Sequence, residues 1–419
     1  MKRLCTALSV LFLLTVPLSA GEVALLETEA APVLLDPLPA LELHSRSAVL
    51  IDAATGAVLF AKNEDELIPP ASLTKLMTIY IALNQVEAGL ITLDDVVALP
   101  PETWGRNQPV GSSLMRLASG HTVTLRELIL GMTIPSGNDA AVAAALHCAP
   151  SVDAFATLMN DEAQKLGLTK LHFVEPSGIS EFNLVTALEF AFFCREYVQR
   201  YPYALAEFHT VPEFAYPKAE NLPPPYRKNP GTVVQRNHNP LLGIFEGTDG
   251  LKTGYIDESG HNLALTAQRN GTRLIAITLG ASSIRLRNED GLALLTWGFE
   301  HFKTLHILLA PLPPVSIWKG ALNKATVITV ETELEFMVRA ERGQELHWEM
   351  QVSEPLVAPL SAGSEVGELI VADSVGELRR IAIITHEEVE EGGFFKRLWD
   401  SIRLFFRRIK QKKSATTQL

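Results

Sequence analysis

Hydrophobic and polar residues alternate from Ser47 to Lys62 on both sides of an Ala-Ala-Thr-Gly turn, a pattern that predicts a β-hairpin. Pro69-Pro70 ends the alternation, and the apolar residues that follow recur at helical spacing, so a helix is expected from residue 71. Two later strand-like runs, Asn262–Ala267 and Arg273–Leu279, flank Asn270-Gly271, a dipeptide typical of tight hairpin turns. Helical spacing also predicts helices over residues 138–146, 152–166, 185–201 and 291–302.

The pattern changes near Leu305. Beyond this point the hydrophobic runs are short, rich in β-forming residues and separated by turn residues, as in an all-β domain. Glu391-Gly-Gly393 then forms a flexible joint before a last helix. The strand-like runs lie at residues 326–330, 334–338, 346–352 and 381–384.

The chain is long enough for more than one folded core. It has 419 residues, of which 47% are hydrophobic and 20% charged, an ordinary globular composition. We expect a signal peptide at 1–20, a linker at 21–43, a mixed helix-and-strand domain at 44–304, an all-β domain at 305–390, and a basic amphipathic helix with a tail at 391–419.

The first twenty residues have the order of an export signal. Two basic residues precede an apolar run at 8–16, which is too short to span a bilayer, and small residues end at Ala20. The cleavage position stays open, because cleavage after Ala20 would leave Leu18 where a smaller residue is usual. Export would permit one disulfide, but Cys148 and Cys194 lie in apolar, helix-like stretches, so buried free thiols are predicted.

Charge is unevenly distributed along the chain. The formal net charge of −12 argues against nucleic-acid binding, yet residues 396–413 carry eight basic residues against Asp400 alone, so this tail is +7 and the rest is −19. The tail's apolar residues form one stripe at helical spacing, as in helices that lie in a membrane interface without spanning it. A helix docked on a partner protein is the alternative. The stripe comprises Phe395, Leu398, Trp399, Ile402, Phe405, Phe406 and Ile409.

Three short strings carry the candidate chemistry: Ser72-Leu-Thr-Lys75, Ser136-Gly-Asn138 and Lys252-Thr-Gly254. Each alone is commonplace, since a Ser-x-x-Lys string is usually a capped helix start and Ser-Gly-Asn a helix cap or loop. In this order they supply a hydroxyl nucleophile, two lysines, a second serine and an amide. These are the groups needed for acyl transfer without histidine.

The first string places a nucleophile beside a base. Ser72 and Lys75 lie one helical turn apart, so the lysine amine can reach the serine hydroxyl. A lysine acts as a base only when it is neutral, so its pKa must be lowered. Burial and a second nearby cation both lower a lysine pKa, and Lys252 is the candidate for that cation.

The other two strings supply supporting groups. Ser136 can relay a proton to a leaving amine, and the Asn138 amide can hold a substrate carbonyl while hydrogen-bonding the first lysine. The third string leads into an expected edge strand, where Lys252 supplies fixed charge and Thr253 a hydroxyl. Gly254 would let the substrate backbone approach closely.

These strings resemble those of the serine-type D-alanyl-D-alanine carboxypeptidases, which are low-molecular-mass penicillin-binding proteins of the penicillin-binding-protein-five type. The resemblance runs nearly end to end and includes Asn237-His-Asn-Pro-Leu-Leu242, Leu295-Thr-Trp-Gly-Phe299 and the terminal Glu391-Gly-Gly-Phe-Phe395. It implies an α/β (α+β) fold: a serine β-lactamase/transpeptidase-like domain with an antiparallel sheet flanked by helices, then a small all-β sandwich domain and a C-terminal amphipathic helix.

The resemblance also implies a reaction path. Ser72 would attack the carbonyl between the two terminal D-alanines of a peptidoglycan stem pentapeptide, with Lys75 as general base, to form an acyl-enzyme that water hydrolyses. Ser136, with Lys252, would pass a proton to the departing D-alanine. The backbone N–H groups of Ser72 and Tyr255 would form the oxyanion hole.

Substrate recognition is implied at the other end of the site. Thr253 and Arg287 would hold the free carboxylate of the C-terminal residue, the alternative for Arg287 being an exposed surface arginine beside Arg285. Two positions depart from close relatives. Tyr255 stands where histidine is frequent, and His238 stands where arginine is frequent, either lining the cleft or serving as a structural histidine.

We therefore expect an exported hydrolase that trims peptidoglycan stems at the periplasmic face of the bacterial cytoplasmic membrane. It would attach through residues 394–413 and be acylated by β-lactam antibiotics. No metal, other cofactor or nucleic acid is expected, because the remaining histidines lack metal-ligand spacing and no Gly-rich phosphate loop is present. A D,D-endopeptidase and a catalytically silent wall-binding protein are the alternatives; the intact strings argue against the second. A β-lactamase is disfavoured, because a freely diffusing drug hydrolase has no use for the tail.

Overall fold

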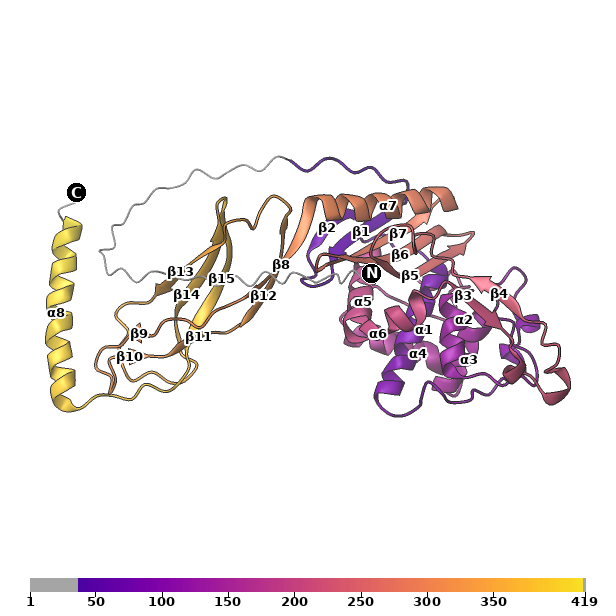
Figure 1. Cartoon of the computed structure of the whole chain (residues 1–419), viewed down its shortest axis with the longest axis horizontal. Coiled ribbons are helices and arrows are strands. Elements are labelled where there is room, and N and C mark those ends of the chain that lie inside the picture. Colours follow the sequence, from indigo (N-terminus) through magenta and orange to yellow (C-terminus); the bar gives the residue numbers. More distant parts are fainter. Residues whose placement is uncertain (1–36, 417–419) are drawn as a thin grey trace, which may run out of the picture. The chain divides into compact units, whose positions relative to one another are not determined.

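The structure is a computed structural model, and it describes residues 37–416 (Figure 1). The predicted signal peptide and residues 21–36 of the predicted linker lie outside the described residues. The first domain is built on a five-stranded antiparallel sheet in the order β2-β1-β7-β6-β5, as expected. Its strands are β1 Ser47–Asp52, β2 Val58–Lys62, β5 Thr248–Ile256, β6 Gly260–Arg269 and β7 Thr272–Ala281, and a separate two-stranded sheet pairs β3 Glu213–Tyr216 with β4 Val233–Arg236.

The two predicted hairpins are confirmed. β1 and β2 pair through the Ala-Ala-Thr-Gly turn, and β6 and β7 pair up to Arg269 opposite Thr272. Asn270 and Gly271 between them have φ values of 49° and 86°, the positive values that a two-residue type I′ turn requires. β5, which carries Lys252, is an edge strand as predicted.

Helices cover both faces of this sheet, because successive residues of each strand point to opposite sides. Ile275 and Ile277 of β7 join the core shared with α1 (Lys75–Glu87) and α5 (Ala187–Arg200), whereas Leu274 and Ala276 pack with α7 (Ile284–His301). The helices are α1 Lys75–Glu87, α2 Leu125–Thr133, α3 Asn138–Cys148, α4 Val152–Lys165, α5 Ala187–Arg200, α6 Pro202–Ala204 and α7 Ile284–His301. Cys148 and Cys194 are free thiols, as predicted; Cys194 is buried as predicted, whereas Cys148 is only partly buried.

Helix α7 begins seven residues before the predicted start at 291, so that prediction was wrong at its N-terminal end. The Ser283 hydroxyl caps the helix by accepting a hydrogen bond from Leu286 N at 3.3 Å. The polar residues of the first two turns interrupt the apolar spacing, which hid them from the sequence pattern. Arg287 is therefore part of the helix and does not precede it.

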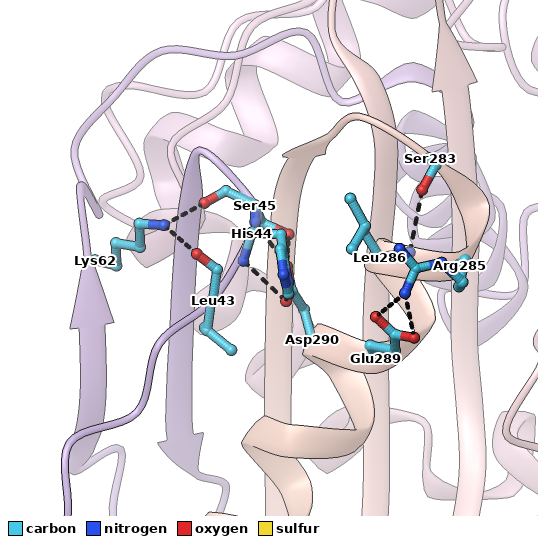
Figure 2. Close-up of polar contacts among 9 residues, drawn as sticks. All are labelled: Leu43, His44, Ser45, Lys62, Ser283, Arg285, Leu286, Glu289 and Asp290. Atoms are coloured by element: carbon cyan, nitrogen blue, oxygen red, sulfur yellow. Dashed lines mark hydrogen bonds and ion pairs between the residues drawn. The ribbon is translucent and has the colours of Figure 1, made fainter.

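The segment before β1 is fixed to α7 by one buried carboxylate. Asp290 accepts hydrogen bonds from His44 N at 3.0 Å, Ser45 N at 2.7 Å and the Ser45 hydroxyl at 2.5 Å (Figure 2). Lys62 of β2 holds the same segment by donating to the carbonyls of Leu43 and Ser45. Leu43, the last residue of the predicted linker 21–43, is thus held on the folded domain together with His44 and Ser45.

The second domain is all β, as predicted, and has its own hydrophobic core. A four-stranded sheet in the order β11-β15-β14-β13 is accompanied by the pairs β12-β8 and β10-β9. The predicted boundary at 304/305 falls inside β8, whose residues all pair with β12. The strands are β8 Phe302–Leu308, β9 Val315–Ser316, β10 Lys324–Ala325, β11 Val327–Thr329, β12 Glu333–Arg339, β13 His347–Val352, β14 Glu365–Asp373 and β15 Gly376–Thr385.

The predicted terminal helix is present as α8, Phe394–Thr416. Asp400 and Leu404 are buried, and the Asp400 carboxylate accepts a hydrogen bond from Lys319 N at 2.8 Å. The predicted apolar stripe lies elsewhere on the helix and is exposed, with Phe395 83% and Trp399 63% exposed. Among residues 37–416, no single helix is long and apolar enough to cross a membrane. Only the pair formed by α3 and α4, which is bent by 83° at its junction, reaches the length and apolar composition of a membrane span.

Candidate active site

The chain enters α1 through a 3-10 turn, Ala71–Thr74, which carries Ser72. Lys75 is the first residue of α1, and its side chain is fully buried. Its Nζ lies 2.9 Å from Ser72 Oγ, so the predicted contact between nucleophile and base is present. That distance is the geometry a general base needs to take the hydroxyl proton.

Two further acceptors fix the amine of Lys75. Its Nζ donates to Asn138 Oδ1 at 2.8 Å and to the carbonyl of Ser177 at 2.5 Å. Burial lowers the pKa of Lys75 to about 7, while the negative charges of Glu175 and Asp139 oppose the shift. Burial, rather than the predicted second cation, is thus the leading cause of the lowered pKa.

The second string forms the turn that precedes α3. Ser136 has a φ of 62° and a buried Oγ, which has no hydrogen-bond partner among the described residues. Asn138 opens α3, and its own N–H donates to Ser113 O. The buried Asp139 carboxylate accepts from the backbone N–H groups of residues 115–117, so it fixes the loop that leads away from Ser113.

The third string lies on the edge strand β5. Lys252 is buried, and its Nζ donates to Thr253 O at 3.0 Å. Burial holds the pKa of Lys252 well below its usual value, and the charges of Lys75 and Arg287 lower it further. The two lysines therefore interact electrostatically, as the sequence suggested, and the interaction lowers the pKa of Lys252.

Gly254 has a different reason to be glycine from the one predicted. A Cβ at this position would lie 2.7 Å from Pro70 O and 3.1 Å from Ser72 N. The strand therefore packs against the backbone at residues 70–72, and a side chain would collide with that backbone. Close approach of the chain's own main chain, before any substrate is considered, excludes a side chain here.

Arg287 is 7% exposed, so the alternative of a surface arginine is wrong. Its Nε and Nη2 both donate to Asn288 Oδ1, and no acidic partner is found for it within residues 37–416. Burial lowers the pKa of Arg287 to about 10. Arg285, in contrast, is exposed and ion-paired with Glu289 one turn along the helix (Figure 2).

The two departures from close relatives both line the cavity. Asn237 and Asn239 hold the irregular segment around His238 through bonds to the carbonyls of His209 and Gly250. Burial lowers the pKa of His238 to about 4, with smaller contributions from the nearby cations, so this imidazole is neutral. Tyr255 is 53% exposed, and its ring stacks on His261 with centroids 4.4 Å apart.

A cavity of about 820 Å³ brings these groups together. Eight of the ten predicted site residues line it, and Lys75 and Lys252 lie buried directly beside them. Two parts of the site were not predicted from the sequence, because neither has a distinctive motif: the cavity rim at 110–113 and the segment at 177–179. The predicted residues that line the cavity are Ser72, Ser136, Asn138, His238, Thr253, Gly254, Tyr255 and Arg287.

The chemistry of the cavity is that of acyl transfer by a serine. A hydroxyl, an amine whose pKa is about 7, a spare hydroxyl and two further basic side chains converge on one space. Clusters of three or more metal-ligating side chains are absent from the described part of the chain.

Comparisons with known proteins agree with this geometry. The family model described as D-alanyl-D-alanine carboxypeptidase matches residues 34–283, and that of the penicillin-binding protein 5 C-terminal domain matches residues 310–391. The chain is 35% identical over 368 residues to the D-alanyl-D-alanine carboxypeptidase DacD of Escherichia coli, covering 86% of this chain and 90% of the relative. It is 30% identical over 259 residues to a D-alanyl-D-alanine endopeptidase of Pseudomonas aeruginosa, covering 61% of this chain and 77% of the relative.

Solved structures give the same result. Penicillin-binding protein 5 of Haemophilus influenzae has a TM-score of 0.72 at 27% identity and covers 85% of this chain and all of its own. A Listeria monocytogenes penicillin-binding protein in its ampicillin-bound form has a TM-score of 0.53 at 29% identity, over 62% of this chain and 99% of its own. The chain belongs to the D-alanyl-D-alanine carboxypeptidase family of penicillin-binding proteins and is a serine-type D-alanyl-D-alanine carboxypeptidase with a C-terminal β domain.

Proposed function

We propose that Ser72 is the nucleophile of this carboxypeptidase and that Lys75 is its general base. The observation that carries the proposal is the 2.9 Å contact between Ser72 Oγ and a fully buried Nζ. With a pKa of about 7, a large fraction of Lys75 is neutral at neutral pH and can accept a proton. Burial keeps bulk water from competing for that contact.

The reaction proceeds in two balanced stages. Ser72 Oγ attacks the carbonyl carbon of the bond between the terminal D-alanines, and its proton passes to Lys75 Nζ. The C–N bond then breaks, the proton held by Lys75 passes through Ser136 to the leaving amine, and an ester to Ser72 remains. Lys75, neutral again, takes a proton from the water that attacks this ester; the ester bond breaks, the proton returns to Ser72 Oγ, and the shortened stem peptide is released. The N–H groups of Ser72 and Tyr255 stabilise the oxyanion in both stages.

The role of Ser136 rests on its buried hydroxyl. Because Oγ has no partner among the described residues, both its donor and its acceptor capacity are free for a substrate. An unpaired buried hydroxyl costs free energy, which is regained when the leaving amine arrives. Lys252 supplies the positive charge that favours this proton transfer.

The terminal carboxylate of the substrate fits the other end of the cavity. Arg287 is a buried guanidinium without an acidic partner within residues 37–416, and Lys252 is a buried amine whose pKa is lowered by burial and, further, by two neighbouring cations. A bound carboxylate would favour the charged forms of both groups. Together with the Thr253 hydroxyl, they select a peptide that ends in a free carboxylate, as a carboxypeptidase requires.

The test of the catalytic proposal is intact-mass analysis after incubation with a penicillin, followed by product analysis on a stem pentapeptide. Ser72→Ala should gain no drug mass and release no D-alanine, while Ser282→Ala, an exposed serine, should behave as the wild type. A Ser72→Ala protein that still gains the mass of the drug contradicts the assignment. Cleavage of cross-linked dimers into monomeric stem peptides faster than release of D-alanine from pentapeptides would instead favour the endopeptidase alternative.

We also propose that the protein is exported and attaches to the periplasmic face of the cytoplasmic membrane through α8. The stripe on α8 remains exposed although Asp400 and Leu404 of the same helix are buried, so the fold leaves its apolar side uncovered. Basic residues at 396–413 would add attraction to anionic lipids of about 1 kcal/mol each. Truncation before Gly392 should release the protein from anionic liposomes and leave D-alanine release intact; a truncated form that still sediments with the liposomes contradicts the proposal.

A further inference from the structure

A segment outside the three strings contacts the first turns of α1. This segment, residues 174–183, is an irregular part of the connection between α4 and α5. The carbonyl of Ser177 accepts from Lys75 Nζ at 2.5 Å, and that of Pro176 accepts from Thr78 Oγ1 at 2.7 Å. The position of this segment therefore fixes one of the three acceptors around the general base.

A single carboxylate organises the segment. Glu175 accepts hydrogen bonds from Ser177 N at 2.7 Å, Ser177 Oγ at 2.6 Å, Gly178 N at 2.6 Å and Asn183 Nδ2 at 2.9 Å. The first two bonds reach Oε2 and the other two reach Oε1, so both oxygens are used. Backbone donors that would otherwise lack partners in an irregular segment are thereby satisfied.

The segment also has no freedom to move toward α1. Gly178 has a φ of 81°, and a Cβ built there would lie 1.8 Å from Ala71 O. Asn183 ties the far end of the segment to Thr74 through a hydrogen bond of 3.2 Å. Glu175 therefore closes a turn that is pressed against the residues flanking Ser72.

We propose that Glu175 is a positioning residue for the general base: its carboxylate sets the place of the Ser177 carbonyl that holds Lys75, and its charge favours the ammonium form of that lysine. The inference rests on the proposed role of Lys75. Glu175 does not itself line the cavity, and its carboxylate bonds to Ser177 and to the lining residue Gly178, so it acts through this turn and through space.

The charges around Lys75 make this effect measurable. Glu175 faces it from the 174–183 segment and Asp139 from α3, while Lys252 on β5 and the neutral His238 lie on the other side. Burial lowers the pKa of Lys75, and the two carboxylates keep it from falling below about 7. Removal of one negative charge should therefore lower this pKa further and leave more of the lysine neutral in mild acid.

The test is the pH profile of penicillin acylation for Glu175→Gln, with Glu181→Gln as the matched control. Glu181→Gln makes the same substitution at an exposed position of the same segment, so the pH profile of its acylation should match that of the wild type. An amide can replace only one of the two acceptor oxygens, so the alkaline plateau of Glu175→Gln should fall. Its acidic limb should move to lower pH by roughly half to one unit from the wild-type pKa of about 7, which is about a 2.5- to 5.5-fold gain at pH 6 relative to its own plateau.

A second variant separates position from charge. Glu175→Asp keeps the charge but shortens the side chain, so its plateau should fall while its acidic limb stays in place. The proposal is overturned if the acidic limb of acylation does not move in Glu175→Gln. It is also overturned if the plateau rate of Glu175→Asp equals that of the wild type. A Lys75→Ala protein that still acylates would instead refute the proposed base, whatever the Glu175 variants do.

Discussion

Replacement of Arg287 by alanine tests how the enzyme reads the end of its substrate. The guanidinium is 7% exposed and has no acidic partner within residues 37–416, so a substrate carboxylate would be its first full counter-charge. A hydrogen bond to a charged group contributes about 1.5–3 kcal/mol, which corresponds to roughly 10- to 150-fold in rate. Arg287→Ala should lose that factor in kcat/KM on a pentapeptide ending in free D-alanine.

The comparison substrate is the same peptide with a C-terminal amide, which lacks the carboxylate. Arg287→Ala should lose little on the amide, so the wild type's preference for the acid should largely disappear. The matched control is Arg285→Ala, which removes an exposed guanidinium already paired with Glu289 and should change neither rate (Figure 2). Equal losses of Arg287→Ala on acid and amide would refute the reasoning and leave Arg287 a structural role only.

Three further outcomes are expected. Because Lys75 is a base only when neutral and its pKa is about 7, wild-type acylation should fall about tenfold per pH unit below 7; a limb near pH 5 would contradict the proposed base. Asp290→Ala should lower the free energy of unfolding by about 3 kcal/mol in urea titrations, since it orphans buried donors at Ser45, and an unchanged midpoint would contradict that account. Four serine substitutions in the α8 stripe should abolish liposome binding and leave D-alanine release unchanged, because each apolar side chain contributes up to about 1.5–3 kcal/mol to binding. Raised salt alone should release only part of the protein, because it screens the basic residues and leaves the apolar contacts. A fourfold variant that still binds liposomes would refute the proposed anchor. The four positions are Phe395, Trp399, Ile402 and Phe406.

The parts of the fold that sequence could predict are those set by local rules. Strand alternation and the Asn270-Gly271 turn located the sheet, because two-residue hairpins demand positive φ at both central positions. The spacing of Ser72 and Lys75 likewise predicted their contact, since residues three apart on a helical turn face one another.

What the sequence could not show are side chains that bond to the backbone of irregular segments or are buried by tertiary packing. Glu175 bonds to main-chain N–H groups of an irregular segment, and such bonds leave no period or motif. Arg287 was recognised only by resemblance, because the polar first turns of α7 carry no apolar stripe. Its burial, and the cause of the lowered pKa of Lys75, depend on packing that only the three-dimensional structure displays.

The two glycines that enclose the nucleophile limit how this enzyme can evolve under antibiotic selection. Gly178 and Gly254 press on the main chain at residues 70–72 from two different segments, and any side chain at either would push against atoms that carry Ser72. Neither glycine can therefore be replaced without displacing that main chain. A lineage that must exclude a bulky drug yet keep a slender peptide has room for change chiefly at the rim, where the side chains of Val110 and Ile179 stand exposed to solvent.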